Sequence, residues 1–274
     1  GTLSWAAWKD VIERTPEGMV PIPAGWFPRG KWPRRHWVYV DSFYLAKYEV
    51  TNQQYCSFLN DLRTDRDGNG RLMVITNRAG CGIATDRGQF FVRQGYDRYP
   101  ATNVTWYGAV AFCNWLSQRE RLERGYNEDC RVDLNKCGYR LPTEAEWERA
   151  SGKGISAKEF SAVRRQVTGV LECERPVGSH EPNPFGVYDL EGSSGEWCHD
   201  AFDESFYRKR SAKPRVNPLC GNNVVVRVVR GSILWPSRPR GVLSSRIARH
   251  ARGTDKDLSA IGFRVCRSGH RLAR

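Results

Sequence analysis

Three threonines that can begin helices restrict the fold of this chain more than any other feature. Thr51-Asn-Gln-Gln54 and Thr143-Glu-Ala-Glu146 have the form of capping boxes. In a capping box the Thr hydroxyl accepts a hydrogen bond from a backbone amide, and the Gln or Glu side chain accepts one in return. Thr105 precedes apolar residues at helical spacing, and Gly125 can end that helix. The sequence therefore predicts three helices, at about residues 51–62, 105–124 and 143–150.

Between these helices the chain has the character of short strands and turns. Residues 38–45 alternate loosely between apolar and polar types, which is typical of a strand. The region from Gly186 onward predicts further strands at Val187, 224–229 and 261–266. Twenty-six glycines and 14 prolines favour many loops, and no repeat or low-complexity linker divides the chain. We expect one α+β domain spanning residues 1–274.

The charge of the chain is concentrated near its C-terminus. The net charge is +13, and residues 201–274 contain 17 basic and 4 acidic residues. Such a field favours an unknown protein or an anionic ligand as partner, although a solubilising surface would look the same. Basic residues interleaved with Trp235, Phe206 and Tyr207 make nucleic acid a third partner class, but no known nucleic-acid motif supports it.

Nine cysteines bear on the compartment, because an odd number cannot all pair within one chain. Cys56, Cys113 and Cys198 have apolar neighbours and are expected in the core. Cys130 and Cys137 flank a polar loop and are candidates for a disulfide. There is no CxxC pair or zinc-type spacing, so a reducing compartment is favoured. With no apolar run of membrane-spanning length and no visible signal peptide, we expect a cytoplasmic location.

Eight segments, in order, resemble the formylglycine-generating-enzyme, or sulfatase-modifying-factor, family. They are Gly18–Gly25, Lys47–Tyr55, Pro100–Trp115, Tyr139–Glu148, Asn183–Gly192, Gly195-Glu-Trp197, Val228-Val-Arg-Gly231 and Ile261-Gly-Phe-Arg264. The resemblance implies a C-type-lectin-like fold with short helices, small antiparallel sheets and many irregular loops. It also implies that the tryptophans of these motifs lie in or near the core, namely Trp106, Trp115, Trp147 and Trp197.

The family contains oxidases, sulfoxide synthases and non-catalytic binding proteins, so the fold does not decide the function. The oxidases of this family bind copper through two cysteines. Alignment of this chain to the family pattern puts Gly241 and Arg246 at those two positions. Neither residue can bind a soft cation, which argues against copper-dependent oxidation. The five histidines are dispersed and show no iron-binding spacing, which argues against a sulfoxide synthase. We therefore expect no catalytic residues, while an enzyme with altered chemistry stays open.

Calcium is the one cofactor that the sequence suggests. Asp65, Asp67 and Asn69 have the spacing of the first oxygen ligands of a calcium loop, and Gly70 follows them. The twelfth position holds no carboxylate, so a polar turn is the alternative reading of this loop. The family resemblance adds Glu196 as a second weak calcium candidate, although the asparagine of the family motif is replaced by serine.

The stretch 232–260 departs most from the family pattern. It mixes Trp, Arg and small hydroxyl residues without helical or strand periodicity, a composition typical of binding surfaces. The resemblance places the mutable residues of variable proteins from diversity-generating retroelements here, whereas an ordinary divergent loop is the alternative. We expect a non-catalytic ligand-binding protein that displays residues 230–264. The predicted ligand-binding residues are Leu234, Trp235, Ser237, Arg238, Arg240, Val242, Ser245, Arg246, Ile247, His250 and Arg252.

Overall fold

A computed structural model describes residues 15–29, 36–78, 80–152, 175–190, 194–203, 206, 214–221, 226–231 and 256–269. The prediction of an α+β fold is confirmed. The helices in these ranges are α2 (Asn52–Leu62), α3 (Trp106–Arg119), α4 (Glu144–Ala150) and the 3-10 helix η1 (Lys256–Ala260). None of them has both the length and the hydrophobicity needed to cross a bilayer.

The three predicted helices begin where the threonines indicate. Thr51, Thr105 and Thr143 are the N-caps of α2, α3 and α4, and the first and third form complete capping boxes. Helix α3 is shorter than predicted and ends at Arg119 instead of reaching residue 124. The chain turns away there because Arg121 has a positive φ of 56°, so Gly125 is not needed to end the helix.

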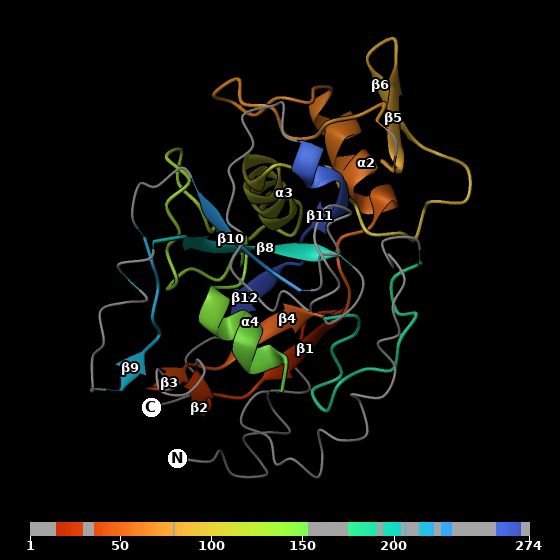
Figure 1. The fold of residues 1–274 in the computed structure, drawn as a ribbon. Coiled ribbons are helices and arrows are strands. Elements are labelled where there is room, and N and C mark those ends of the chain that lie inside the picture. The colour runs from red at the N-terminus through yellow and green to blue at the C-terminus, as the bar shows by residue number, and fades with distance from the viewer. Residues whose placement is uncertain are drawn as a thin grey trace.

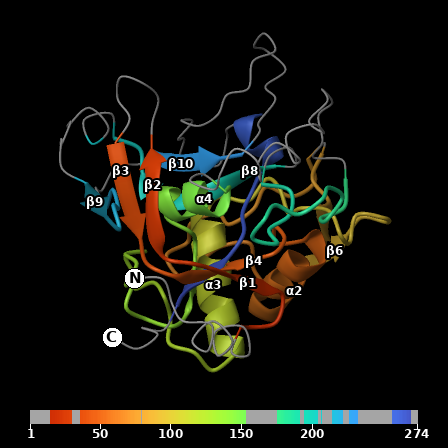
Figure 2. The same cartoon turned by 90° about the horizontal axis from the view of Figure 1, so that it is seen from below.

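Within the described ranges the strands form four small sheets. The first contains, in spatial order, β1 (Met19–Ile22), β4 (Phe43–Ala46), β12 (Cys266–Ser268) and β7 (Tyr139–Arg140). The second contains β10 (Arg227–Arg230), β8 (Gly195–Ala201) and β11 (Ile261–Gly262), and the third contains β2 (Gly25–Arg29), β3 (His36–Val40) and β9 (Arg215–Val216). The fourth is the hairpin of β5 (Ile83–Asp86) and β6 (Gln89–Val92). Helix α2 packs on this hairpin at one end of the molecule, and β2, β3 and β9 lie at the opposite end (Figures 1 and 2).

Two of the predicted strands are not continuous in the structure. The stretch 38–45 is broken at Asp41 and Ser42, so β3 and β4 belong to different sheets. The stretch 261–266 is divided in the same way between β11 and β12. Val187 lies outside any strand, and in the stretch 224–229 the described strand is β10. After each break the chain continues in a different sheet: β4 pairs with β1 and β12, and β12 pairs with β4 and β7.

The strand β8 divides the core into two clusters. All seven of its residues are buried. Trp197 packs with α2 and α3 in one cluster, whereas the next residue, Cys198, packs with α4 and the inner faces of β2 and β3 in the other. Successive residues of a strand point to opposite faces, so β8 supplies both clusters at once. The prediction for Trp106, Trp147 and Trp197 is confirmed, and Trp115 is partly buried against the first cluster.

Candidate functional site

The eleven predicted ligand-binding residues, and the copper-position residues Gly241 and Arg246, lie outside the described residues. The two ends of that segment are described, however. Arg230 of β10 pairs with Glu196 of β8, and Ile261 of β11 pairs with the preceding residue Gly195. Neighbouring strands are about 4.8 Å apart, so the chain leaves and rejoins the sheet within about 10 Å. Both ends of the segment are therefore held by one end of β8.

A buried ion pair fixes this end of β8. Arg264 donates to Glu196 through Nη2 to Oε1 at 2.6 Å and through Nε to Oε2 at 2.8 Å, and both side chains are fully buried. Trp147 of α4 donates its indole N–H to Glu196 Oε2 at 2.8 Å. Arg264 also donates to backbone carbonyls, including that of Lys47. The carboxylate considered as a calcium ligand is therefore already bonded through both oxygens.

A second buried cluster is formed by Glu144 and Glu148 of α4. Arg29 bonds to both Glu144 and Glu148, and Arg230 donates to Glu148 Oε1 at 3.0 Å. The guanidinium of Arg230 also lies 5.1 Å from the centre of the Trp147 ring. These glutamates bind arginines from β2 and β10, so β10 is tied to the scaffold immediately before residue 232.

The side chains of His199 and Asp200 are buried, and their pKa values differ strongly from those of exposed histidine and aspartate. Burial, reinforced by Glu144, raises the pKa of Asp200 from 3.8 to about 7. Burial, reinforced by Arg227 and Arg140, lowers the pKa of His199 from 6.5 to about 3. Cys198 packs in one cluster while the His199 ring lies 5.8 Å from that of Trp106 in the other, as expected for adjacent residues of a strand. The two cannot form a nucleophile–base dyad.

The cysteines in the described ranges are free thiols. The predicted pairing of Cys130 with Cys137 is wrong, because both are unpaired. Cys56, Cys113 and Cys198 are buried as expected. Burial raises the pKa of Cys113, Cys198 and Cys266 above the ordinary thiol value, so these groups stay protonated near neutral pH.

The predicted calcium loop is held by protein groups. The Asp67 carboxylate accepts from the Arg71 guanidinium at 2.6 Å and from two backbone amides of the same loop. Asn69 donates its side-chain amide to the carbonyl of Glu128. Across the described ranges no three carboxylate, His or Cys side chains form a metal-binding group. These contacts are those of an ordinary polar turn.

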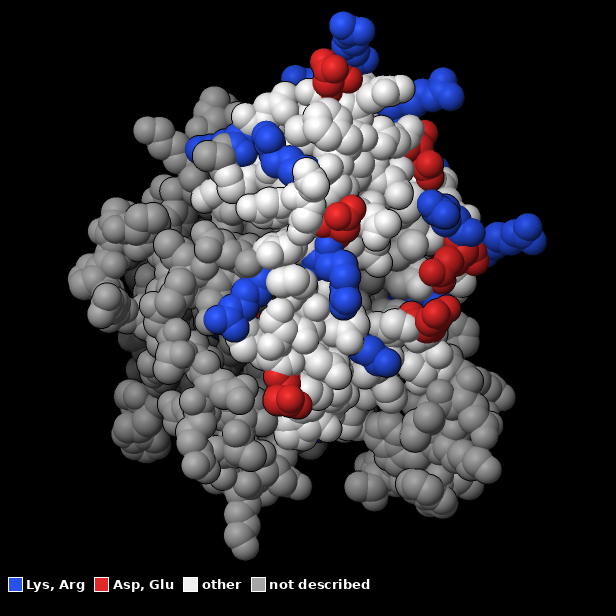
Figure 3. All heavy atoms as spheres, turned by 90° about the vertical axis from the view of Figure 1, so that its right-hand side faces the viewer, with Lys and Arg blue, Asp and Glu red and all other residues white. Residues whose placement is uncertain are grey.

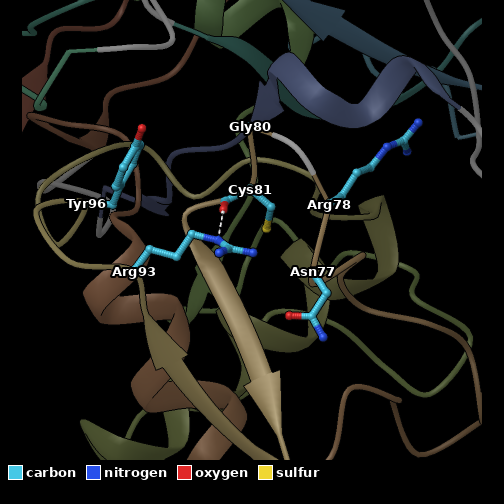
Figure 4. A pocket seen from close by; sticks show the side chains of 6 residues that line it. All are labelled: Asn77, Arg78, Gly80, Cys81, Arg93 and Tyr96. Carbon is cyan, nitrogen blue, oxygen red and sulfur yellow. Dashed lines mark hydrogen bonds between the residues drawn. The ribbon is translucent and has the colours of Figure 1, made fainter.

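A recess of about 310 Å³ lies beside the place where the candidate segment rejoins the scaffold. It is lined by Asn77, Arg78, Gly80, Cys81, Arg93 and Tyr96. The carbonyl of Gly80 lies 3.5 Å from the Thr102 hydroxyl, and the next residue, Asn103, donates its amide to the carbonyl of Leu258 in η1. Figure 4 shows Arg93 reaching beneath Cys81, where its Nε donates to the Cys81 carbonyl at 3.0 Å.

The recess is cationic. Its described lining residues include two arginines and no carboxylate. The bond to Cys81 uses Nε of Arg93 and leaves the two terminal nitrogens pointing away from that carbonyl, in the geometry that can grip a carboxylate or phosphate. The recess could not be found from the sequence, because its residues come from two separate stretches, 77–81 and 93–96, and form no motif.

The fold and its buried ion pairs define a C-type-lectin-like scaffold, in which short helices and small sheets support long loops. The chain belongs to the sulfatase-modifying factor enzyme 1-like (FGE-sulfatase) domain family, which it matches over residues 7–269. This shows the family that the sequence motifs indicated.

Individual relatives differ in kind. The chain is 29% identical over 262 residues to the serine/threonine-protein kinase pkn1 of Chlamydia pneumoniae, covering 91% of this chain and 38% of that protein. It therefore spans well under half of that relative. It is 25% identical to the formylglycine-generating enzyme of Bos taurus, covering 93% of this chain and 75% of the enzyme. The solved structure of Treponema denticola variable protein 1 matches with a TM-score of 0.61 and 21% identity, covering 92% of this chain and 95% of that one. That likeness shows the fold alone.

Proposed function

We propose that this protein is a non-catalytic ligand-binding protein that displays residues 230–264 on a C-type-lectin-like scaffold, in the manner of retroelement variable proteins. The observation that carries the proposal is the anchoring of both ends of the segment on β8. Arg230 and Ile261 pair with adjacent residues of that strand. A segment held in this way can change its side chains without disturbing the core, which is what a display surface requires.

The chemistry of the scaffold supports a binding role over a catalytic one. The buried carboxylates Glu144, Glu148 and Glu196 are bound by arginines, which suits a structural role. Three buried thiols have raised pKa values, which disfavours their use as nucleophiles. The recess at Arg93 adds a cationic contact beside the returning end of the segment, so the ligand class we favour carries carboxylate or phosphate groups.

The alternative is a family enzyme or accessory subunit with altered chemistry, and copper retention separates it from the proposal. Because Gly241 and Arg246 stand at the copper-cysteine positions, the protein should retain well under one copper ion per chain after aerobic loading and exhaustive dialysis. Elemental analysis measures this. One tightly held Cu(I) per chain, together with oxygen consumption on a cysteine-containing peptide, would overturn the non-catalytic assignment.

The retroelement assignment has its own test, which is independent of the metal. Sequencing the DNA around the gene should reveal a reverse-transcriptase gene and a near-repeat of the DNA that encodes residues 230–264. Mismatches between the two copies should be confined to adenines of the template copy. A locus with neither feature would remove the variable-protein assignment, while a ligand-binding role at the same segment would still stand on the anchoring geometry.

A further inference from the structure

Two tight turns form the recess beside the hairpin of β5 and β6. They cover residues 78–81 and 93–96, and in each the amide of the last residue donates to the carbonyl of the first, at 3.1 and 3.0 Å. Gly80 and Gly95 are the third residues of these turns, and their φ angles of 79° and 83° are those that a type II turn requires at that position. Each turn therefore depends on a glycine, because other residues rarely adopt this conformation.

Hydrogen bonds join the two turns to each other and to α2. The Arg93 amide donates to the Gly82 carbonyl at 2.9 Å, and its Nε donates to the Cys81 carbonyl at 3.0 Å. The buried Asn52 of α2 donates its side-chain amide to the Tyr96 carbonyl at 3.0 Å. The recess is therefore built into the scaffold, so that a ligand bound there would not have to order its backbone.

The recess contains one guanidinium whose orientation is fixed. The bond from Nε to the Cys81 carbonyl orients the Arg93 side chain and leaves its Nη1 and Nη2 without a partner among the described residues. Figure 4 shows the second arginine, Arg78, pointing away from Arg93. Burial raises the pKa of the Cys81 thiol, so this group stays neutral near pH 7 and does not repel an anion. The geometry therefore provides one two-pronged donor.

The charges around the recess favour a ligand with a single negative group. The side of the molecule that carries α2 and the hairpin of β5 and β6 faces the viewer in Figure 3, and basic and acidic side chains are interspersed over it. A polyanion is bound by several cations along its path, which interspersed charges do not provide. One guanidinium instead matches the two oxygens of one carboxylate.

The size of the recess and the ring of Tyr96 restrict the rest of the ligand. A volume of about 310 Å³ lies at the lower end of the range of roughly 300–1,000 Å³ for ligand pockets, so the ligand is small. Tyr96 stands on the side of the recess opposite Arg78 and Asn77 (Figure 4), and 42% of its surface is accessible. An exposed ring of this kind packs well against a second aromatic ring.

We propose that this recess binds a small carboxylate that carries an aromatic ring. The two carboxylate oxygens accept hydrogen bonds from Nη1 and Nη2 of Arg93, and the ring of the ligand packs against Tyr96. A free aromatic acid and the C-terminal aromatic residue of a peptide share this chemistry. The inference deepens the proposed function and rests on it for the role of the ligand, although the recess contains none of the residues 230–264.

The test is a fluorine NMR titration with 4-fluorophenylacetate. The wild-type protein should bind it with a dissociation constant of about 1 mM, as expected for a ligand of about ten non-hydrogen atoms in an open recess. Arg93→Gln should bind at least about tenfold more weakly, because the charged donor is lost. Arg93→Lys keeps the charge without the two-pronged geometry and should bind at least about threefold more weakly. Tyr96→Ala should lose at least about twofold, because the ring contact is removed.

Arg87→Gln is the matched control. Arg87 is exposed in the turn between β5 and β6, and Arg93 lies at the opposite end of this hairpin. The variant therefore makes the same change in net charge about 15 Å away, beyond the screening length at physiological salt. Its affinity for the acid should stay within about twofold of the wild type. The uncharged 4-fluorophenylacetamide should bind the wild type at least about tenfold more weakly than the acid.

Several results would overturn the proposal: no saturable binding of the acid, unchanged binding by Arg93→Gln, an equal loss in Arg87→Gln, or an amide that binds as tightly as the acid. Binding of 4-fluorophenyl phosphate about tenfold more tightly than the acid would also overturn it, because two charges would then be recognised. N-acetyl-4-fluorophenylalanine models the end of a peptide, and its affinity relative to 4-fluorophenylacetate distinguishes the two sources of the ligand.

Failure of this proposal can be told apart from failure of the proposed function. Without binding that depends on Arg93, the segment 230–264 would still be anchored on β8 through Arg230 and Ile261. Conversely, retained copper or a gene locus without a near-repeat would remove the display assignment, while the Arg93 variants would still report on binding of the fluorinated acid.

Discussion

Two three-stranded sheets of this protein differ in how far their faces are exposed to solvent. The sheet of β10, β8 and β11 is enclosed, and every residue of β8 is buried. The sheet of β2, β3 and β9 is covered on one face by the core and presents the exposed side chains of Trp26, Trp37 and Val216 on the other. The enclosed sheet contains buried ions, histidine and tryptophan, whereas the open sheet contains exposed rings. Substitutions in the first should therefore change stability strongly, and those on the exposed face of the second should change it little.

The largest effect is expected at Trp197 in the enclosed sheet. Its side chain is fully buried, and its indole N–H donates to the carbonyl of Val104 at 2.9 Å. Trp197→Ala should lower the free energy of unfolding by about 3–5 kcal/mol, because a large cavity remains and a buried carbonyl loses its donor. Urea denaturation measures this loss. A change of less than about 0.5 kcal/mol would mean that β8 is not the enclosed strand described above.

The pH dependence of stability is expected to show opposite contributions from two adjacent residues of β8, His199 and Asp200. The lowered pKa of His199 gives stability that is present above about pH 6.5 and is lost as the pH falls toward 3. The raised pKa of Asp200 gives stability that is present below about pH 3.8 and is lost as the pH rises toward 7. Between about pH 4 and 6.5 the two contributions should nearly cancel.

Single variants separate the two slopes. In Asp200→Asn the remaining His199 contribution should raise stability by about 1.4 kcal/mol per pH unit in this window. In His199→Gln the remaining Asp200 contribution should lower it by about the same amount per unit. Urea titrations at several pH values provide the measurement, and only the slopes are compared because each variant also loses contacts. Slopes of the same sign in both variants would contradict the assignment.

The smallest effect is expected at Trp37 in the open sheet. More than half of its side chain is accessible, so Trp37→Ala should lower the free energy of unfolding by less than about 1 kcal/mol. The same urea titration used for Trp197→Ala measures it, which makes the two tryptophans a matched pair. A loss as large as that of Trp197→Ala would show that the ring is covered in solution and would remove the contrast between the sheets.

Local sequence signals predicted the helices well, because each signal and its effect lie within a few residues. Thr51 and Thr143 form their capping boxes with residues three positions away. The motif tryptophans were placed in the core by resemblance to the family. The broken strand at Asp41 could not be foreseen, since the change of sheet depends on β9 and β12, which lie more than 170 positions later in the chain.

Contacts between residues far apart in the sequence also explain why the positions of some candidate-site residues could not be predicted. Arg29 stands in an exposed-looking, Gly- and Pro-rich stretch, yet it is buried because Glu144 and Glu148 arrive from α4. Arg93 gains its position from a carbonyl twelve residues earlier. The contact between Trp26 and Tyr39 likewise depends on the strand register, because the two residues are separated in sequence but lie directly opposite in the sheet. No local pattern contains this information.

The attachment of both β10 and β11 to β8 also bears on how this protein can evolve in length. Closing a loop whose ends are already held together costs free energy only as the logarithm of its length, so doubling it adds about 0.6 kcal/mol. This is small beside the several kcal/mol lost when one buried tryptophan is removed. Insertions and deletions between Gly231 and Lys256 should therefore be tolerated as readily as substitutions, and the scaffold could accept replacement inserts that vary in size as well as in sequence.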